Sequence, residues 1–189
     1  RQLAFVTTGL WVRRFDQATA TAVPGTDGAT YPFWSPDGRA IGFFADGKLK
    51  RIDLSGGAPQ ALANAPSGRG GAWSADGVIL FSPITNSGLL RIPDTGGAPV
   101  AVTAPKTGES SYRWPQFLPD GHHFLFRVAL GRPDTRGTYV GSLEGGTPTR
   151  VLQDETAAVF APPDLLLVVR QGVLMALRYC RKTKTSTMP

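Results

Sequence analysis

The side chains that could perform acid–base or metal chemistry are few in this sequence and lie far apart. Its histidines are the adjacent pair His122 and His123, and no Gly-x-Ser-x-Gly nucleophile elbow accompanies them. Adjacent residues of a strand point to opposite faces, so one histidine at most could face a site. Asp37, Asp76 and Asp120 each occupy a separate turn-like motif and do not cluster as metal ligands do. The sequence therefore predicts no catalytic centre, metal site or cofactor site in this chain.

A repeated aromatic position organises the chain. Each aromatic closes a short apolar run and precedes a turn sequence, SPDG, SADG, LPDG or APPD; the four residues are Trp34, Trp73, Phe117 and Phe160. Their spacings are 39, 44 and 43 residues, which is typical of β-propeller blades. A Gly-Gly-x-Pro turn recurs at 56–59, 96–99 and 145–148, and proline there suits an outer edge strand. We predict an all-β fold, a β-propeller of four-stranded antiparallel blades, whose repeated aromatics pack between neighbouring blades.

The period also divides the chain into about 4.5 blade repeats. Full blades are expected at 29–66, 67–105 and 106–153, with partial blades at 1–28 and 154–177, so that 1–177 is one propeller segment. Residues 178–189 fit no blade, and we expect a basic, disordered tail. An unclosed arc exposes sheet edges, and the sequence begins at Arg1 without a signal-peptide pattern. We therefore expect a fragment of a larger propeller, with a small closed ring as the alternative.

Charge and hydropathy argue against two kinds of partner. The formal net charge is +6, but four basic residues of the last twelve supply +4 of it, which leaves +2 for the propeller. We therefore expect no nucleic-acid binding. The longest apolar stretch, 165–177, is interrupted by Arg170, Gln171 and Gly172, so we expect no membrane contact by this segment itself. The single cysteine, Cys180, excludes an internal disulfide framework.

Binding is the chemistry that remains, and the repeat alignment provides candidate residues. Arg69 and Arg113 both stand four residues before a repeated aromatic, and Tyr31 and Trp114 stand three before one. Since equivalent positions of adjacent blades lie at the same level of a propeller channel, these residues should meet at its mouth. Such a pair of arginines favours a carboxylate or another anionic group. Alternatively, each arginine pairs with an acid of the same loops, namely Asp27, Glu109, Asp154 or Glu155.

A longer loop adds to this face. The turn between the second and third strands becomes ALGRPDTRG, residues 129–137, in the fourth repeat, and insertions of this kind often serve recognition. By strand count it lies on the same face as Arg69 and Arg113, and it contributes Arg132 and Arg136. The candidate ligand-binding residues are therefore Tyr31, Arg69, Arg113, Trp114, Arg132 and Arg136. The expected partner is a protein, a peptide or a small anionic ligand.

The phrase FWSPDGRAIGFFADGKLKRIDLSGG resembles the WD-like repeat of TolB-type bacterial β-propellers. With YRWPQFLPDGHHFLF, TYVGSL and FAPPDLLLVVRQGVLMA, the sequence is most similar to the propeller region of bacterial receptor-like serine/threonine protein kinases, over about residues 1–177. The resemblance implies a sensor module in an extracytoplasmic or periplasmic location, with the cytoplasm as the alternative. The kinase motifs themselves, the Gly-rich loop, His-Arg-Asp and Asp-Phe-Gly, do not occur in this sequence.

Three functions therefore remain open from the sequence. The first is a non-catalytic binding or sensor module within a longer bacterial protein. The second is the propeller portion of an enzyme chain, either a membrane-anchored serine/threonine kinase or a prolyl-oligopeptidase-like peptidase, in which such propellers accompany a separate hydrolase domain. The third is a purely structural or assembly role. We expect this chain itself not to be an enzyme.

Overall fold

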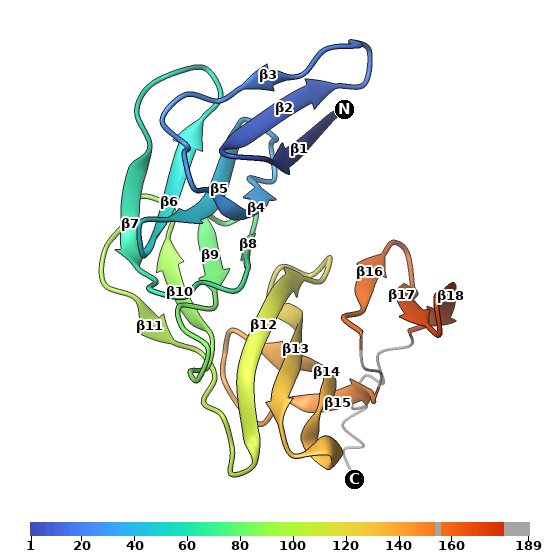
Figure 1. Cartoon of the computed structure of the whole chain (residues 1–189). Helices are drawn as coiled ribbons and strands as arrows, with labels where there is room; N and C mark the ends of the chain where they lie inside the picture. Colours follow the sequence, from blue (N-terminus) through green and yellow to red (C-terminus); the bar gives the residue numbers. More distant parts are fainter. Residues whose placement is uncertain (154–155, 180–189) are drawn as a thin grey trace, which may run out of the picture.

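The computed structural model describes residues 1–153 and 156–179, which form five antiparallel β-sheets (Figure 1). The first sheet has three strands: β1 (Gln2–Val6), β2 (Leu10–Arg14) and β3 (Thr21–Ala22). The second has four: β4 (Thr30–Trp34), β5 (Ala40–Ala45), β6 (Lys48–Asp53) and β7 (Gln60–Asn64). The third also has four: β8 (Gly71–Trp73), β9 (Val78–Phe81), β10 (Leu90–Pro93) and β11 (Val100–Ala101).

The fourth and fifth sheets continue this pattern. The fourth sheet consists of β12 (Glu109–Phe117), β13 (His123–Gly131), β14 (Gly137–Ser142) and β15 (Thr149–Leu152), with a 3₁₀ turn, η1 (Pro133–Thr135), between β13 and β14. The fifth has three strands: β16 (Val159–Ala161), β17 (Leu165–Arg170) and β18 (Val173–Arg178). In every sheet the strands pair in the order of the sequence, as in a propeller blade. The predicted all-β propeller fold is confirmed.

Residues 154, 155 and 180–189 lie outside the described residues. The tail that was predicted to be disordered falls largely in this part, and so does Cys180. Two of the acids proposed as alternative arginine partners, Asp154 and Glu155, also fall there. Within the described part, no helix could cross a membrane.

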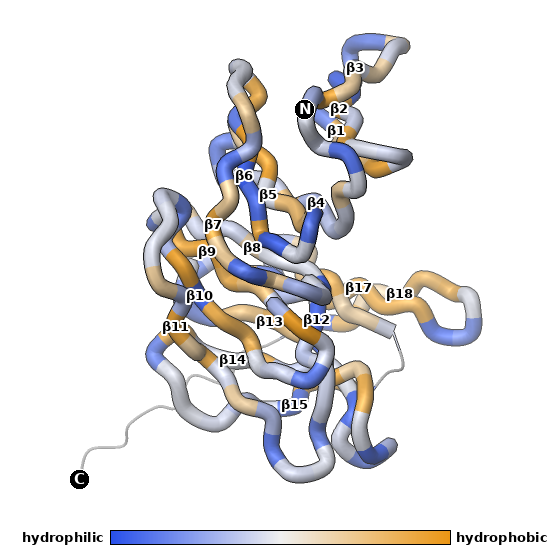
Figure 2. The backbone as a smooth tube through the Cα atoms, turned by 60° about the vertical axis from the view of Figure 1, so that its left-hand side comes forward, coloured by the Kyte–Doolittle hydropathy of each residue, from blue (hydrophilic) through white to orange (hydrophobic). Residues whose placement is uncertain are grey.

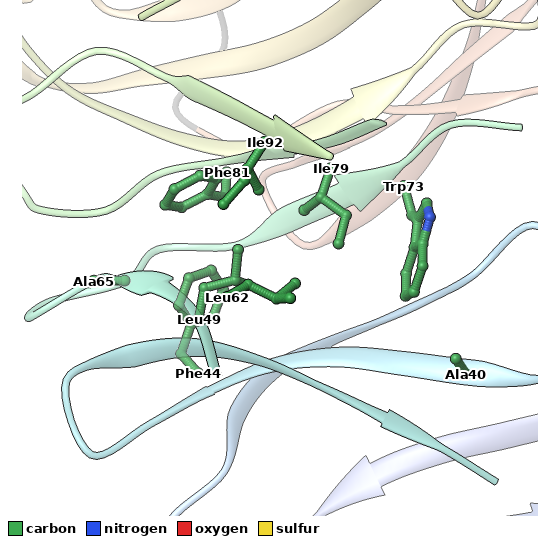
Figure 3. Close-up of a cluster of buried hydrophobic side chains, with 9 residues drawn as sticks. All are labelled: Ala40, Phe44, Leu49, Leu62, Ala65, Trp73, Ile79, Phe81 and Ile92. Atoms are coloured by element: carbon green, nitrogen blue, oxygen red, sulfur yellow. The ribbon is translucent and has the colours of Figure 1, made fainter. Parts of the chain in front are cut away.

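The core is divided into clusters that each join two consecutive sheets. Strand β5 shows why: Ile41 and Phe43 pack toward the first sheet, whereas Ala40 and Phe44 pack toward the third. Figure 3 shows the cluster between the second and third sheets, where Trp73 lies beside side chains of both. The repeated aromatics belong one each to the four clusters: Trp34, Trp73, Phe117 and Phe160. Burial between sheets therefore holds the consecutive blades together.

Two of the turn aspartates, Asp37 and Asp120, accept local hydrogen bonds. Asp37 accepts hydrogen bonds from the Ser35 hydroxyl at 2.6 Å and from the Arg39 backbone N–H at 3.0 Å, and these two bonds lower the pKa of its carboxyl group. Asp120 likewise accepts the backbone N–H groups of His122 at 3.1 Å and of His123 at 2.9 Å. Contacts of this kind are those of turn-forming side chains. Over 1–153 and 156–179, no group of three or more His, Cys, Asp or Glu side chains meets in a way that could hold a metal ion.

Candidate functional site

The segments that lead to the repeated aromatics of the second, third and fourth sheets share an unusual backbone feature. The residue three positions before the repeated aromatic has a positive φ in each: +49° at Tyr31, +100° at Gly70 and +50° at Trp114. A proline follows each of the two non-glycine residues, Tyr31 and Trp114. Proline has no backbone N–H to donate to a neighbouring strand, and it restricts the backbone conformation of the residue before it. Strand pairing accordingly shifts register between Thr30 and Phe33 and between Arg113 and Gln116. Tyr31 and Trp114 thus lie on β-bulges in a conformation that non-glycine residues rarely adopt, a kind of strain that concentrates at functional sites.

These bulges bring four of the six candidate residues together. Strands β4, β8 and β12 contact one another in turn, and the Trp114 backbone N–H donates to the Arg69 carbonyl oxygen across 2.9 Å. The Arg69 guanidinium carbon lies 6.0 Å from the centre of the Tyr31 ring, and that of Arg113 lies 6.0 Å from the centre of the Trp114 ring. Gly70 allows this approach, because a Cβ atom there would lie 3.0 Å from Trp114 Cδ1. We call Tyr31, Arg69, Arg113 and Trp114 the arginine–aromatic cluster.

The two arginines of this cluster form no ion pair among the described residues. Glu109, one of the acids proposed as a partner, instead accepts the Lys106 backbone N–H at 3.1 Å and the Tyr112 hydroxyl. Burial and this hydrogen bond raise the pKa of Tyr112. Arg113 Nε donates to the Ser111 hydroxyl, whereas Arg69 Nε is buried without a hydrogen-bond partner. The cluster therefore presents guanidinium donors that no described carboxylate neutralises.

A third arginine lies beside the cluster and was missed from the sequence. Arg127 on β13 is the cross-strand neighbour of Arg113, only 7% exposed, and its Nη1 donates to the Thr156 carbonyl oxygen at 2.9 Å. The sequence did contain a signal for this residue, because Arg127 interrupts the apolar run HFLFRVAL. Charged side chains are rarely buried within such a strand unless they have a partner.

Arg132 and Arg136 do not join the cluster. Arg132 forms an ion pair with Asp134, with Nε 3.0 Å from Oδ1, and Arg136 donates twice to the Gly131 carbonyl oxygen at 3.1 and 3.0 Å. The prediction that 129–137 is all loop was wrong at both ends, since Gly137 begins β14 and residues 129–131 belong to β13. They extend β13, because β12 begins as early as Glu109 and pairs with them. The longer hairpin places both arginines at its exposed end, beyond the level of Arg113.

The histidines lie at the opposite end of β13 from this hairpin tip. His122 is exposed, and His123 Nδ1 lies 2.8 Å from Asp120 Oδ2 within the same turn.

This end of the sheets also holds a groove of about 620 Å³ between the second and third sheets. In it, the Arg51 guanidinium stacks 5.2 Å from the Trp73 ring and donates to the Asp94 carbonyl oxygen, while Trp73 Nε1 donates to the Asp94 carboxylate at 3.2 Å. These contacts join two blades to each other.

The strain at position 114 has a measurable consequence. In an ordinary strand position, a glycine variant is normally less stable toward unfolding than an alanine variant by about 0.5–1 kcal/mol. In the left-handed conformation the order reverses, because that conformation costs alanine about 1–2 kcal/mol. Trp114→Gly should therefore be about 1 kcal/mol more stable than Trp114→Ala in urea denaturation, the reverse of the usual order. The same pair of substitutions at Phe117, whose φ is not positive, should follow the usual order. An alanine variant that equals the glycine variant at 114 would contradict the left-handed conformation.

Comparison with known proteins identifies the fold. No family model matches the sequence, and no curated protein matches it. A gluconolactonase from Xanthomonas campestris superposes with a TM-score of 0.70 at 14% identity, covering 90% of this chain and 65% of the lactonase. A streptogramin B lyase gives 0.66 at 13% identity, covering 96% and 66%. A prolyl endopeptidase gives 0.61 at 18% identity, covering 84% and 27%.

This chain spans less than two thirds of the length of each of these structures. The shared architecture is the β-propeller, which carries many unrelated functions. In fold, the chain is similar to β-propeller proteins that include a lactonase, a lyase and a peptidase.

Proposed function

We propose that this chain is a non-catalytic β-propeller module that binds a carboxylate-bearing peptide or protein segment at the arginine–aromatic cluster. The observation that carries the proposal is that Arg69 and Arg113, from consecutive blades, lie beside aromatic rings and form no ion pair with any described acid. Guanidinium groups bind carboxylates through paired charge-assisted hydrogen bonds. The buried Arg69 Nε supports the same proposal, since a ligand oxygen would satisfy it.

The aromatic residues define the shape that such a ligand needs. Trp114 is 39% exposed, and Tyr31 is half-buried, so a ligand bound to the arginines would also contact ring surface. Stacking of the guanidinium groups on these rings limits their rotation and so reduces the entropy lost on binding. An acidic side chain within a peptide, flanked by groups that can cover the rings, fits this combination better than a free inorganic anion.

The wider context of the module is also proposed. The TolB-like repeat and its similarity to the propellers of receptor-like serine/threonine kinases support a sensor segment of a longer, extracytoplasmic protein. The fold similarity to a prolyl endopeptidase, of which this chain covers 27%, favours the propeller of a peptidase as the second candidate. In both cases the catalytic groups would belong to a separate domain.

Binding of acidic peptide to purified protein tests the proposal. The probe is a short fluorescein-labelled peptide with two adjacent glutamates, followed by anisotropy, and the comparison peptide carries glutamines instead. We expect Arg69→Gln and Arg113→Gln each to weaken binding roughly tenfold or more, because each removes a charge-assisted hydrogen bond of about 1.5–3 kcal/mol. Binding should also weaken as salt is added.

Arg91→Gln is the matched control. Arg91 is an exposed arginine on β10 that lies outside the arginine–aromatic cluster, so its loss removes the same net charge without touching the site. Equal weakening by Arg91→Gln would reduce the effect to overall charge and contradict the proposal. Equal affinity for the glutamine peptide, or no binding of either peptide by the wild type, would do the same.

A further inference from the structure

The β12–β13 hairpin extends further than the equivalent strands of the other sheets. Both of its strands have nine residues (Figure 1). β12 begins eight residues before its repeated aromatic, whereas β4 begins four before Trp34 and β8 two before Trp73. The equivalent turn of the fifth sheet is the short hydrophilic end of the β17–β18 hairpin (Figure 2). The fourth sheet therefore carries a longer projection, which ends in the 3₁₀ turn η1.

The pairing of this hairpin gives the distance between its end and the arginine–aromatic cluster. The Arg132 backbone N–H donates to the Gly108 carbonyl oxygen at 2.8 Å, so Arg132 lies opposite a residue five positions before Arg113. At about 3.3 Å per residue, five residues of strand span roughly 16 Å. An extended peptide covers the same distance with about five residues. A segment bound at the cluster can therefore continue to the end of the hairpin.

Three arginines gather at this end. Arg132 is held by Asp134, and Arg136 follows η1 directly. Arg150 belongs to β15, but its Nη1 donates to the Asp134 carbonyl oxygen, so its guanidinium group also lies at η1. All three arginines are exposed. We call Arg132, Arg136 and Arg150 the hairpin-tip arginines.

The hairpin tip has an excess of positive charge. Among the residues that the structure describes, the ion pairs of these arginines involve Asp134 alone. The hydrogen bond from Arg132 lowers the pKa of the Asp134 carboxyl group, and the positive charges of Arg132 and Arg150 lower it further. Asp134 is therefore ionised at neutral pH. Three guanidinium groups face one carboxylate, which leaves two positive charges for a ligand.

Hydrogen bonds fix the backbone that carries these arginines. The Thr135 hydroxyl donates to the Gly108 carbonyl oxygen at 2.9 Å, and the Tyr139 hydroxyl donates to the Thr135 carbonyl oxygen at 2.7 Å. On the side of the third sheet, the Ser110 hydroxyl donates to Asn86 Oδ1 at 3.1 Å. A fixed backbone reduces the conformational entropy that the tip loses when a ligand binds.

We propose that the acidic segment bound at the arginine–aromatic cluster carries a second acidic group, about five residues from the first, which binds the hairpin-tip arginines. This inference rests on the proposed function, because the cluster must hold the first group. Once it does, the second group is kept at a high effective concentration near the tip. Contacts between exposed charges are individually weak, so the tip adds affinity to a segment that the cluster already holds.

Three fluorescein-labelled peptides, followed by anisotropy, test this inference. The spaced peptide has two glutamate pairs separated by a four-residue Gly-Ser spacer. The contiguous peptide has the same composition, with all four glutamates together at one end. The single-pair peptide has glutamines in place of the second glutamate pair of the spaced peptide. We expect the spaced peptide to bind about fivefold more tightly than the single-pair peptide, and more tightly than the contiguous peptide.

Two substitutions at the tip should act in opposite directions. Arg136→Gln should remove most of the advantage of the spaced peptide and leave the affinity for the single-pair peptide unchanged. Asp134→Asn removes the carboxylate that occupies Arg132, so it should tighten binding of the spaced peptide roughly twofold. Arg91→Gln, on β10, should leave the ratio of the two affinities as it is in the wild type.

The outcomes separate this inference from the proposed function. Equal binding of the spaced and single-pair peptides overturns the inference, whereas the proposed function stands. A contiguous peptide that binds as tightly as the spaced one reduces the gain to charge alone and also overturns it. So does an advantage of the spaced peptide that survives Arg136→Gln, or one that Asp134→Asn lowers. If none of the peptides binds the wild type, the proposed function fails, and the inference fails with it.

Discussion

Replacing Trp73 by alanine is expected to lower the free energy of unfolding by about 3–5 kcal/mol. Trp73 is 9% exposed and lies in the cluster between the second and third sheets, with Ile79 and Phe44 (Figure 3). The substitution removes the indole from a packed interior and leaves a cavity at the contact between two blades. It also removes the hydrogen bond to Asp94 and the surface on which Arg51 stacks.

Urea denaturation followed by circular dichroism measures this loss. Trp73→Phe keeps an aromatic ring at the contact between the blades. It should lower the free energy of unfolding by less than half as much as Trp73→Ala does. Val100→Ala, at a position 51% exposed, should change stability by no more than about 0.5 kcal/mol. A loss below about 1 kcal/mol for Trp73→Ala would mean that the repeated aromatic does not hold the blades together.

Replacing Gly42 by valine should lower the free energy of unfolding by about 3 kcal/mol, at the upper end for overpacked cores. Gly42 has an ordinary strand φ, so the cause is space alone. A Cβ atom at Gly42 would lie 2.2 Å from Phe33 Cζ, and one at Gly71 in the next blade would lie 2.5 Å from Phe33 Cε1. The Phe33 ring thus occupies the volume that two glycines of adjacent blades leave open.

A double-mutant cycle isolates this contact. Phe33→Leu shortens the side chain, and the double variant Gly42→Val/Phe33→Leu should be more stable than the sum of the two single losses predicts, by about 1–2 kcal/mol. Strict additivity of the two losses would show that Gly42 and Phe33 do not compete for the same volume. Both single variants can be compared in the same denaturation assay.

The sequence by itself determined the architecture, because a propeller repeats one short pattern of turns and strands. The spacing of Trp34, Trp73, Phe117 and Phe160 set the period, and the turns after them set the antiparallel order. The same repetition predicted that Arg69 and Arg113 lie at the same level of the channel mouth in adjacent blades, since equivalent positions of a repeat occupy equivalent places. That inference needed no knowledge of any side-chain contact.

Only the tertiary structure decided which charged side chains meet. Arg132 and Arg136 were grouped with the cluster by strand count, but the longer pairing of β12 with β13 moved them to the hairpin end. Arg127 lies beside the cluster because it is paired in register with Arg113, and the rings of Tyr31 and Trp114, both at β-bulges, lie near the guanidinium groups of Arg69 and Arg113. A period specifies where a strand lies, whereas register shifts and bulges depend on local packing, and these decide where each side chain points.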